Sequence, residues 1–150
     1  MKNKESKMEF QYNDGGRADA GYTGTTGDCA CRAIAIATGK PYQEVYDLIN
    51  EYGQTERRSK RKSKKSTARG GVFMATMKRI MASLGWEWKA TMLVGSGCKV
   101  HLKKDELPEG RIIARVSRHY VAVVDGVVND NHDSSRGGTR CVYGYWYKNE

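Results

Sequence analysis

The stretch GDCACRAIAIATGKPYQEVYDLINEYG, residues 27–53, predicts two consecutive helices. The first covers residues 29–38 and has Asp28 as its N-cap, because aspartate is among the residues preferred at that position. Gly39 ends this helix and Pro41 opens the second, in which apolar and aromatic side chains recur at helical spacing. The fold therefore begins with two helices, and a cysteine lies in the first turn of the first.

The spacing of apolar residues changes along the rest of the chain. Residues 73–84 carry a third helical stripe, which Gly85 stops. Runs rich in β-branched and aromatic residues follow, and the pair at 125–126, Asp-Gly, is a strong signal for a two-residue hairpin turn. The predicted strands cover residues 86–91, 111–116, 119–124, 127–130 and 141–147. Helices followed by an antiparallel sheet indicate the α+β class.

Length and composition indicate one domain with a basic excess. The chain has 150 residues, 39% of them hydrophobic, and a net charge of +9. Most of that excess belongs to residues 56–69, ERRSKRKSKKSTAR, which are too polar to bury an apolar face. We expect a single domain over residues 1–150, with a flexible polar loop at 1–27 and a mobile basic insertion at 56–69.

The basic insertion suggests a partner. Clustered positive charge attracts nucleic acid or an acidic protein face. The simpler interpretation is a solvated loop that aids solubility, and the run has no aromatic residue on which a base could stack. The candidate partner-binding residues are Arg57, Arg58, Lys60, Arg61, Lys62, Lys64 and Lys65.

The sequence carries no sign of export or membrane insertion. No apolar run approaches the roughly 20 residues that cross a bilayer, and the first ten residues lack the apolar core of a secretory signal. We therefore expect a cytoplasmic protein with no membrane partner. All four cysteines are expected to be reduced thiols rather than parts of a disulfide scaffold.

Cys29 is the first candidate for chemistry. Unpaired backbone N–H groups and the positive end of the helix dipole favour a thiolate in the first turn of a helix. Such positions lower the pKa of a thiol and raise its reactivity. A buried structural cysteine is the simpler alternative, so placement alone does not decide for a nucleophile.

The predicted hairpin adds a base and a carboxylate. With a two-residue turn at 125–126, His119 faces His132, and alternation places both on one face of the sheet with Asp130. His119 and Asp130 are then diagonal neighbours, with Cα atoms roughly 7–8 Å apart. Asp133 has the opposite parity, so Asp130 is the carboxylate expected to orient His119. A base oriented by a carboxylate is half of a catalytic triad, although a satisfied sheet histidine and a turn aspartate are the simpler alternatives.

Two blocks of the sequence resemble a known family. GDCACRAIAIATGKPYQEVYDLI, followed later by LPEGRIIARVSRHYVAVVDGVVNDNHD and CVYGYWY, is similar to small phage and bacterial proteins with a papain-like cysteine peptidase fold. The resemblance covers roughly residues 25–50 and 84–147. It implies that Cys29 is the nucleophile, His119 the general base and acid, and Asp130 the group that orients the histidine.

One position departs from the family pattern. Papain-like enzymes usually carry a glutamine about six residues before the nucleophile that donates to the oxyanion, and Thr23 stands there. The candidate oxyanion residues are Gln11, Thr23 and Asp28, together with the backbone N–H of Cys29. Loss of one oxyanion donor costs roughly 10²–10³ in rate, so this departure bears on whether the protein is active.

Other site hypotheses are weaker. A zinc site could draw on Cys29, Cys31, Cys98 and His101, but successive helical residues point about 100° apart, so the first two cysteines diverge. Cys98 is a second candidate nucleophile with no helix after it. His132 caps the hairpin end in our interpretation, with a metal shared with His119 as an alternative. No cofactor or metal is expected.

Three functions follow in order of preference. The first is a cysteine hydrolase of peptidase or isopeptidase type that acts on a protein or peptide through a thioester. The second is a binding or inhibitory module on a degenerate peptidase fold. The third is a nucleic-acid-binding protein that acts through residues 56–69.

Overall fold

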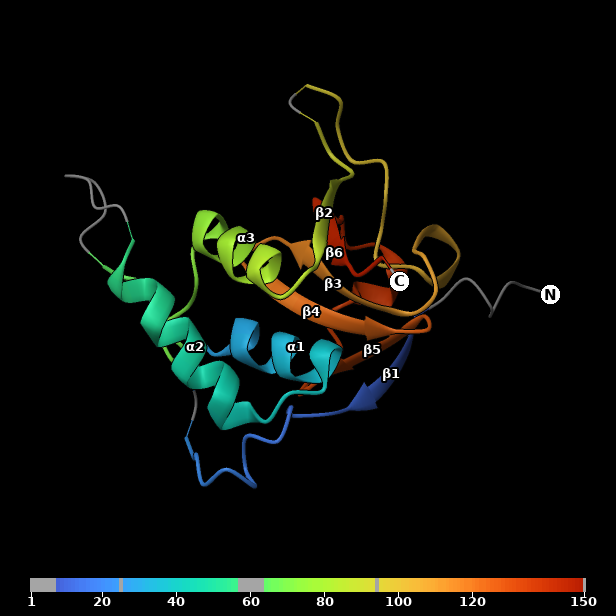
Figure 1. The fold of residues 1–150 in the computed structure, drawn as a ribbon. Coiled ribbons are helices and arrows are strands. Elements are labelled where there is room, and N and C mark those ends of the chain that lie inside the picture. The colour runs from blue at the N-terminus through green and yellow to red at the C-terminus, as the bar shows by residue number, and fades with distance from the viewer. Residues whose placement is uncertain (1–7, 25, 57–63, 94, 150) are drawn as a thin grey trace.

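Three helices pack on one face of a six-stranded sheet in the computed structural model, which describes residues 8–24, 26–56, 64–93 and 95–149 (Figure 1). The helices are α1 (Cys29–Thr38), α2 (Tyr42–Gln54) and α3 (Met74–Ser83). The strands are β1 (Glu9–Tyr12), β2 (Glu87–Ala90), β3 (Arg111–Val116), β4 (His119–Val124), β5 (Val127–Asp130) and β6 (Gly144–Tyr147). The α+β class is confirmed.

The sheet is mixed, and the expectation of a purely antiparallel sheet is wrong. Its strand order is β1-β5-β4-β3-β6-β2, and β1 pairs in parallel with β5 while the other neighbours are antiparallel. The predicted polar loop over 1–27 contains this edge strand. Its four side chains are all exposed, so no alternation of burial marks it in the sequence.

The hairpin of β4 and β5 has the predicted register. Val124 pairs with Val127 and Ala122 with Asn129, which confirms the two-residue turn at 125–126. Asp125 has a φ of 49° and Gly126 a φ of 79°, the left-handed backbone that this kind of turn requires. This register carries His119, at the start of β4, toward Asp130, at the end of β5.

Two apolar clusters pack against the two faces of the sheet. The cluster on the helix side joins α1, α2 and α3 to the sheet through buried residues such as Ile34, Met77 and Trp146. The cluster on the other face is closed by loop residues such as Leu102. Helix α1 packs against β4 (Figure 1). Contacts with the sheet therefore position the first turn of α1, which begins at Cys29.

Helix α1 begins and ends where predicted, but Asp28 acts differently. Asp28 occupies the N-cap position without a side-chain capping hydrogen bond, because its carboxylate binds other partners. Gly39 is the C-cap, with the left-handed φ of 77° that favours glycine.

The ends of the predicted basic insertion pack against the helices. Glu56 is buried and accepts hydrogen bonds from the Ser66 backbone N–H, at 2.9 Å, and from the Thr76 hydroxyl. Ala68 is part of the helix-side core. Lys64 is exposed and Lys65 half-buried. The remaining candidate partner-binding residues, Arg57, Arg58, Lys60, Arg61 and Lys62, lie outside the described residues.

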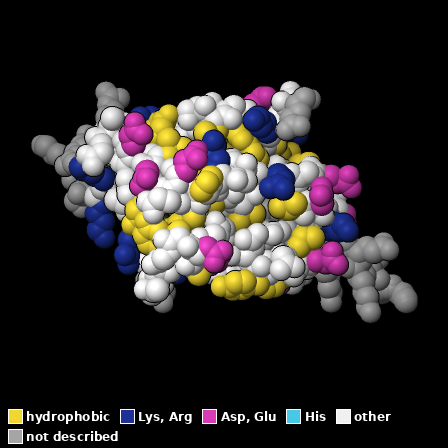
Figure 2. Space-filling model, turned by 60° about the horizontal axis from the view of Figure 1, so that its bottom comes forward, with side chains coloured by type: hydrophobic (Ala, Val, Ile, Leu, Met, Phe, Trp, Pro, Cys, Tyr) yellow, Lys and Arg dark blue, Asp and Glu magenta, His cyan; other side chains and the backbone are white. Residues whose placement is uncertain are grey.

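The surface charge and the length of the described helices bear on the nucleic-acid and membrane expectations. On the face shown in Figure 2, acidic and basic side chains are interspersed with hydrophobic ones, without a continuous patch of one sign. None of the helices in the described ranges is long and apolar enough to span a bilayer.

Two of the four cysteines are paired, so the expectation of four reduced thiols is wrong. Cys98 and Cys141 form a disulfide, and only Cys29 and Cys31 are free. An isolated β-bridge between His101 and Cys141 lies beside the disulfide, which joins residues 43 positions apart in the chain. Local sequence gives no signal for such a long-range pairing.

Candidate active site

The Cys29 thiol is the first side chain of α1 and lies half-buried against the start of β4. Burial raises its pKa, but a hydrogen bond and charge interaction with His119 outweigh burial. The backbone N–H of Tyr120 and the positive charge of Arg32 act in the same direction, so the net pKa of Cys29 is lowered from its ordinary value. The site therefore favours the thiolate.

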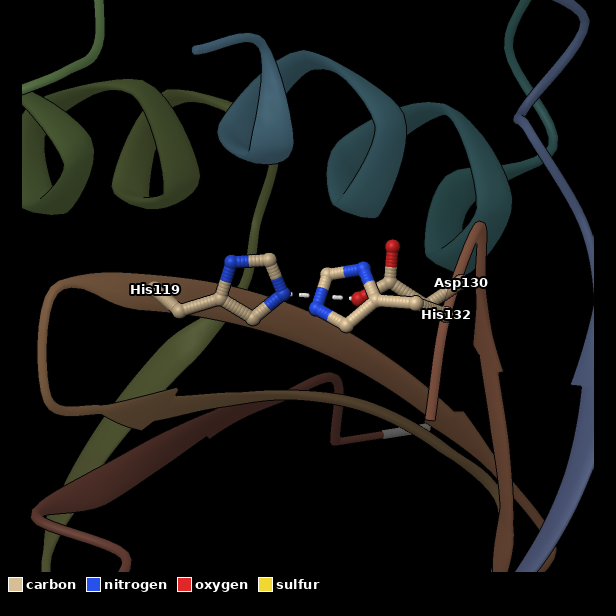
Figure 3. Close-up of side chains that lie close together, drawn as sticks. All are labelled: His119, Asp130 and His132. Atoms are coloured by element: carbon tan, nitrogen blue, oxygen red, sulfur yellow. Dashed lines mark hydrogen bonds and ion pairs between the residues drawn. The ribbon is translucent and has the colours of Figure 1, made fainter. Parts of the chain in front are cut away.

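His119 links the thiol to the sheet. Its Nε2 lies 2.7 Å from Oδ2 of the buried Asp130 (Figure 3), which leaves Nδ1 as the ring nitrogen for the hydrogen bond with Cys29. Burial lowers the pKa of His119, but the bonds to Asp130 and Cys29 outweigh it and raise the pKa to about 9. Burial likewise raises the pKa of Asp130, yet His119 and Arg32 hold it below its usual value. The structure thus brings Cys29, His119 and Asp130 together.

Arg32 ties the carboxylate of the site to the rest of the core. The guanidinium is buried and forms ion pairs with Asp28, at 3.0 Å, and with Asp130. Asp28 also accepts a hydrogen bond from the Tyr42 hydroxyl at 2.6 Å and pairs with Arg17 at 3.1 Å. Arg32 is therefore an ion-pair partner of both carboxylates, and it leaves Oδ2 of Asp130 facing His119.

Cys31 is a poor candidate for chemistry. Its side chain is fully buried, and its thiol donates a weak hydrogen bond to the Tyr42 carbonyl at 3.8 Å. Burial raises the pKa of Cys31 to about 12. The pKa values of the two free cysteines therefore shift in opposite directions, down for Cys29 and up for Cys31. Of the two, Cys29 is the candidate nucleophile.

The three candidate oxyanion side chains do not form a donor set at the thiol. Gln11 is exposed on β1 and donates its amide to the neighbouring Tyr12 carbonyl. Thr23 is exposed and its carbonyl accepts from Arg17. Asp28 is an acceptor engaged by Arg17, Arg32 and Tyr42. The backbone N–H groups in the first turn of α1 remain the donors closest in sequence to Cys29.

The zinc set weighed from the sequence lacks one of its thiolates, because Cys98 is in the disulfide. The same bond removes Cys98 as an alternative nucleophile. His101 has Nε2 at 3.6 Å from the Cys98 sulfur and Nδ1 at 3.1 Å from Oε1 of Glu106. His132 lies instead beside His119, with ring centroids 5.3 Å apart.

A groove between α1, α3 and the sheet lies away from the triad. It has a volume of about 1220 Å³ and sits at the opposite end of α1 from Cys29. Its lining includes Lys40, Trp86, Arg111 and Tyr147. None of the triad residues lines it, so geometry around the thiol, rather than cavity size, defines the candidate site.

Comparisons with known proteins add no family assignment. No family model, curated protein or solved structure matches this chain. The papain-like resemblance therefore stays a prediction, and the function is argued from the site itself.

Several residues of the site were not predicted from the sequence. Tyr42 and Arg17 hold the Asp28 carboxylate, and the backbone of Tyr120 binds the Cys29 sulfur. Tyr42 belongs to the apolar stripe of the second helix, where an aromatic side chain indicates core packing. The hydroxyl that reaches Asp28 depends on how α2 crosses α1, which the sequence pattern does not specify.

Proposed function

We propose that this protein is a cysteine hydrolase that cleaves a peptide, isopeptide or related acyl bond through a thioester intermediate. The observation that carries the proposal is the arrangement of Cys29, in the first turn of a helix, beside a His119 ring that is bonded to Asp130 and lowers the pKa of the thiol. A nucleophile within reach of a base that a third group orients is the general pattern of covalent acyl transfer.

Acylation begins from the thiolate of Cys29 and the imidazolium of His119. The thiolate of Cys29 attacks the carbonyl carbon of the substrate, and a tetrahedral intermediate forms with negative charge on its oxygen. In this proposal, backbone N–H groups at the start of α1 stabilise that oxyanion. The imidazolium of His119 then gives its Nδ1 proton to the leaving amine, the carbon–nitrogen bond breaks, and a thioester on Cys29 remains.

Deacylation reverses the roles of His119. The neutral imidazole takes a proton from a water molecule, and the hydroxide attacks the thioester carbon. The carbon–sulfur bond breaks, the acid product leaves, and the thiolate–imidazolium pair is restored. Asp130 accepts a hydrogen bond from Nε2 throughout, which keeps Nδ1 turned to the sulfur and stabilises the charged ring.

A binding or inhibitory module is the second candidate function, and the position of Gln11 favours it. The Gln11 amide lies on the exposed edge strand with its own backbone neighbour as partner. None of the candidate residues Gln11, Thr23 and Asp28 then supplies a side-chain donor to an oxyanion, as expected of a module that binds without catalysis. The retained Cys29, His119 and Asp130 set favours the hydrolase.

An activated ester tests the proposal without knowledge of the natural substrate. With p-nitrophenyl acetate, we expect a burst of nitrophenolate, an acetyl group on Cys29 detected by mass spectrometry, and continued turnover as the thioester hydrolyses. The Cys29→Ala variant is the matched control and should show none of these three results. Acetylation of Cys29 no faster than that of free N-acetylcysteine, or an acetyl group that is never released, would contradict the hydrolase and favour the binding module.

A further inference from the structure

His119, Asp130 and His132 form a cluster that a triad does not require. Each offers one nitrogen or oxygen atom, and these atoms all lie within 4.8 Å of one another (Figure 3). His119 starts β4, while Asp130 and His132 lie at and just beyond the end of β5. Catalysis uses His119 and Asp130 but leaves the second histidine without a role.

The second histidine is held in a suitable orientation. His132 places Nδ1 2.7 Å from the Asn131 side-chain oxygen, so Nδ1 carries the proton and Nε2 has a free lone pair. A metal-binding histidine usually donates a hydrogen bond from the ring nitrogen that does not bind the metal, and this bond fixes the orientation of the ring. Arg32 occupies Oδ1 of Asp130, and Oδ2 faces the two rings.

We propose that His119 Nε2, Asp130 Oδ2 and His132 Nε2 form a binding site for a divalent transition metal of the zinc class, and that the metal switches off the hydrolase. Two imidazoles and one carboxylate are ligands that zinc accepts, with solvent in the remaining position. Zinc–nitrogen bonds of about 2.0–2.1 Å require ligand atoms roughly 3.3–3.5 Å apart. The His119 Nε2 to Asp130 Oδ2 distance of 2.7 Å must lengthen to admit the ion, and the exposed His132 can move toward both by side-chain rotation.

The switch follows from the shared nitrogen, and this part rests on the proposed function. The metal replaces the proton that His119 Nε2 shares with Asp130, and that proton goes to solvent. Nδ1 keeps its own proton, which a metal-bound imidazole releases only by becoming an imidazolate. The leaving amine is therefore not protonated and turnover stops. Cys29 is not among the three ligands, so its sulfur stays open to alkylation.

Metal binding is measured first in the Cys29→Ala variant, which has no nucleophile and no exposed free thiol. Titration with Co²⁺ should give the visible absorption of a four- or five-coordinate ion at one equivalent, and Zn²⁺ should displace it. Adding His132→Ala should raise the dissociation constant for Co²⁺ at least about tenfold. Adding His101→Ala, which removes the remaining histidine of the chain, should leave it unchanged. Equal effects of the two histidine variants, or no Co²⁺ spectrum, would overturn the site.

The switch is measured in the wild type with saturating Zn²⁺. Turnover of p-nitrophenyl acetate should stop while iodoacetamide still modifies Cys29. Protection of Cys29 from iodoacetamide would place the metal on the thiol and overturn the shared-nitrogen mechanism. If the protein has no esterase turnover at all, the hydrolase and its switch fail, while the Co²⁺ spectrum still decides the metal site.

Discussion

Replacing Cys29 or His119 by alanine is expected to lower turnover of an activated ester by about 10⁴–10⁶-fold each. The physical reason is that the thiol and its base act as one unit: without His119 the thiolate is not stabilised, and without Cys29 there is nothing to acylate. The double variant should therefore be no slower than either single variant, because catalytic groups that act together are strongly non-additive. Steady-state rates of nitrophenolate release measure all three.

Cys31→Ala is the matched control for this prediction. It removes the other free thiol of the same helix, which is buried and has its pKa raised to about 12. Turnover per folded molecule should stay within a few-fold of the wild type. A loss on Cys31→Ala as large as that on Cys29→Ala, or multiplicative losses in the double variant, would mean that the assignment of the nucleophile is wrong.

Arg32→Met is expected to lower the free energy of unfolding by about 3–5 kcal/mol. Methionine keeps most of the apolar stem but leaves the buried carboxylates of Asp28 and Asp130 without their shared cation. Among the described residues, Asp28 then keeps only Arg17, and Asp130 only His119, as a cationic partner, and a desolvated carboxylate that loses a partner is costly. The loss is measured by urea unfolding at neutral pH, followed by far-ultraviolet circular dichroism.

Arg79→Met provides the comparison. Arg79 is exposed, donates to Thr55 at 2.8 Å and stacks over Tyr52, so its replacement should cost less than about 1 kcal/mol. Equal losses from the two substitutions would show that the buried pairs with Asp28 and Asp130 do not hold the fold together.

Much of the fold was predictable because its signals are local. Cys29 and Gly39 mark the ends of α1, and the Asp-Gly turn at 125–126 determines the register that faces His119 toward Asp130. Parity along a strand is a property of the backbone, so it singles out Asp130 over Asp133 without any knowledge of packing. This is why two residues 11 positions apart could be paired from the sequence.

The features that were not predicted depend on contacts between distant segments. Strand β1 has four exposed side chains and is defined only by its pairing with β5. The disulfide joins Cys98 to Cys141 through a loop that carries no regular strand at that point. The Asp28 carboxylate was predicted as a helix cap, but the buried guanidinium of Arg32 and the hydroxyl of Tyr42 bind it more strongly than backbone N–H groups.

The central claim, that Cys29 and His119 form a thiolate–imidazolium pair, is tested most directly by the rate at which iodoacetamide modifies Cys29 between pH 5 and 9. The Cys29 pKa is lowered and the His119 pKa is raised to about 9, so the pair should persist across neutral pH and modification should stay fast below pH 7. In His119→Ala, burial of the thiol is no longer outweighed, and the rate at pH 6.5 should fall about a hundredfold. A wild-type rate that drops tenfold for each pH unit below 9, like an ordinary thiol, would contradict the account.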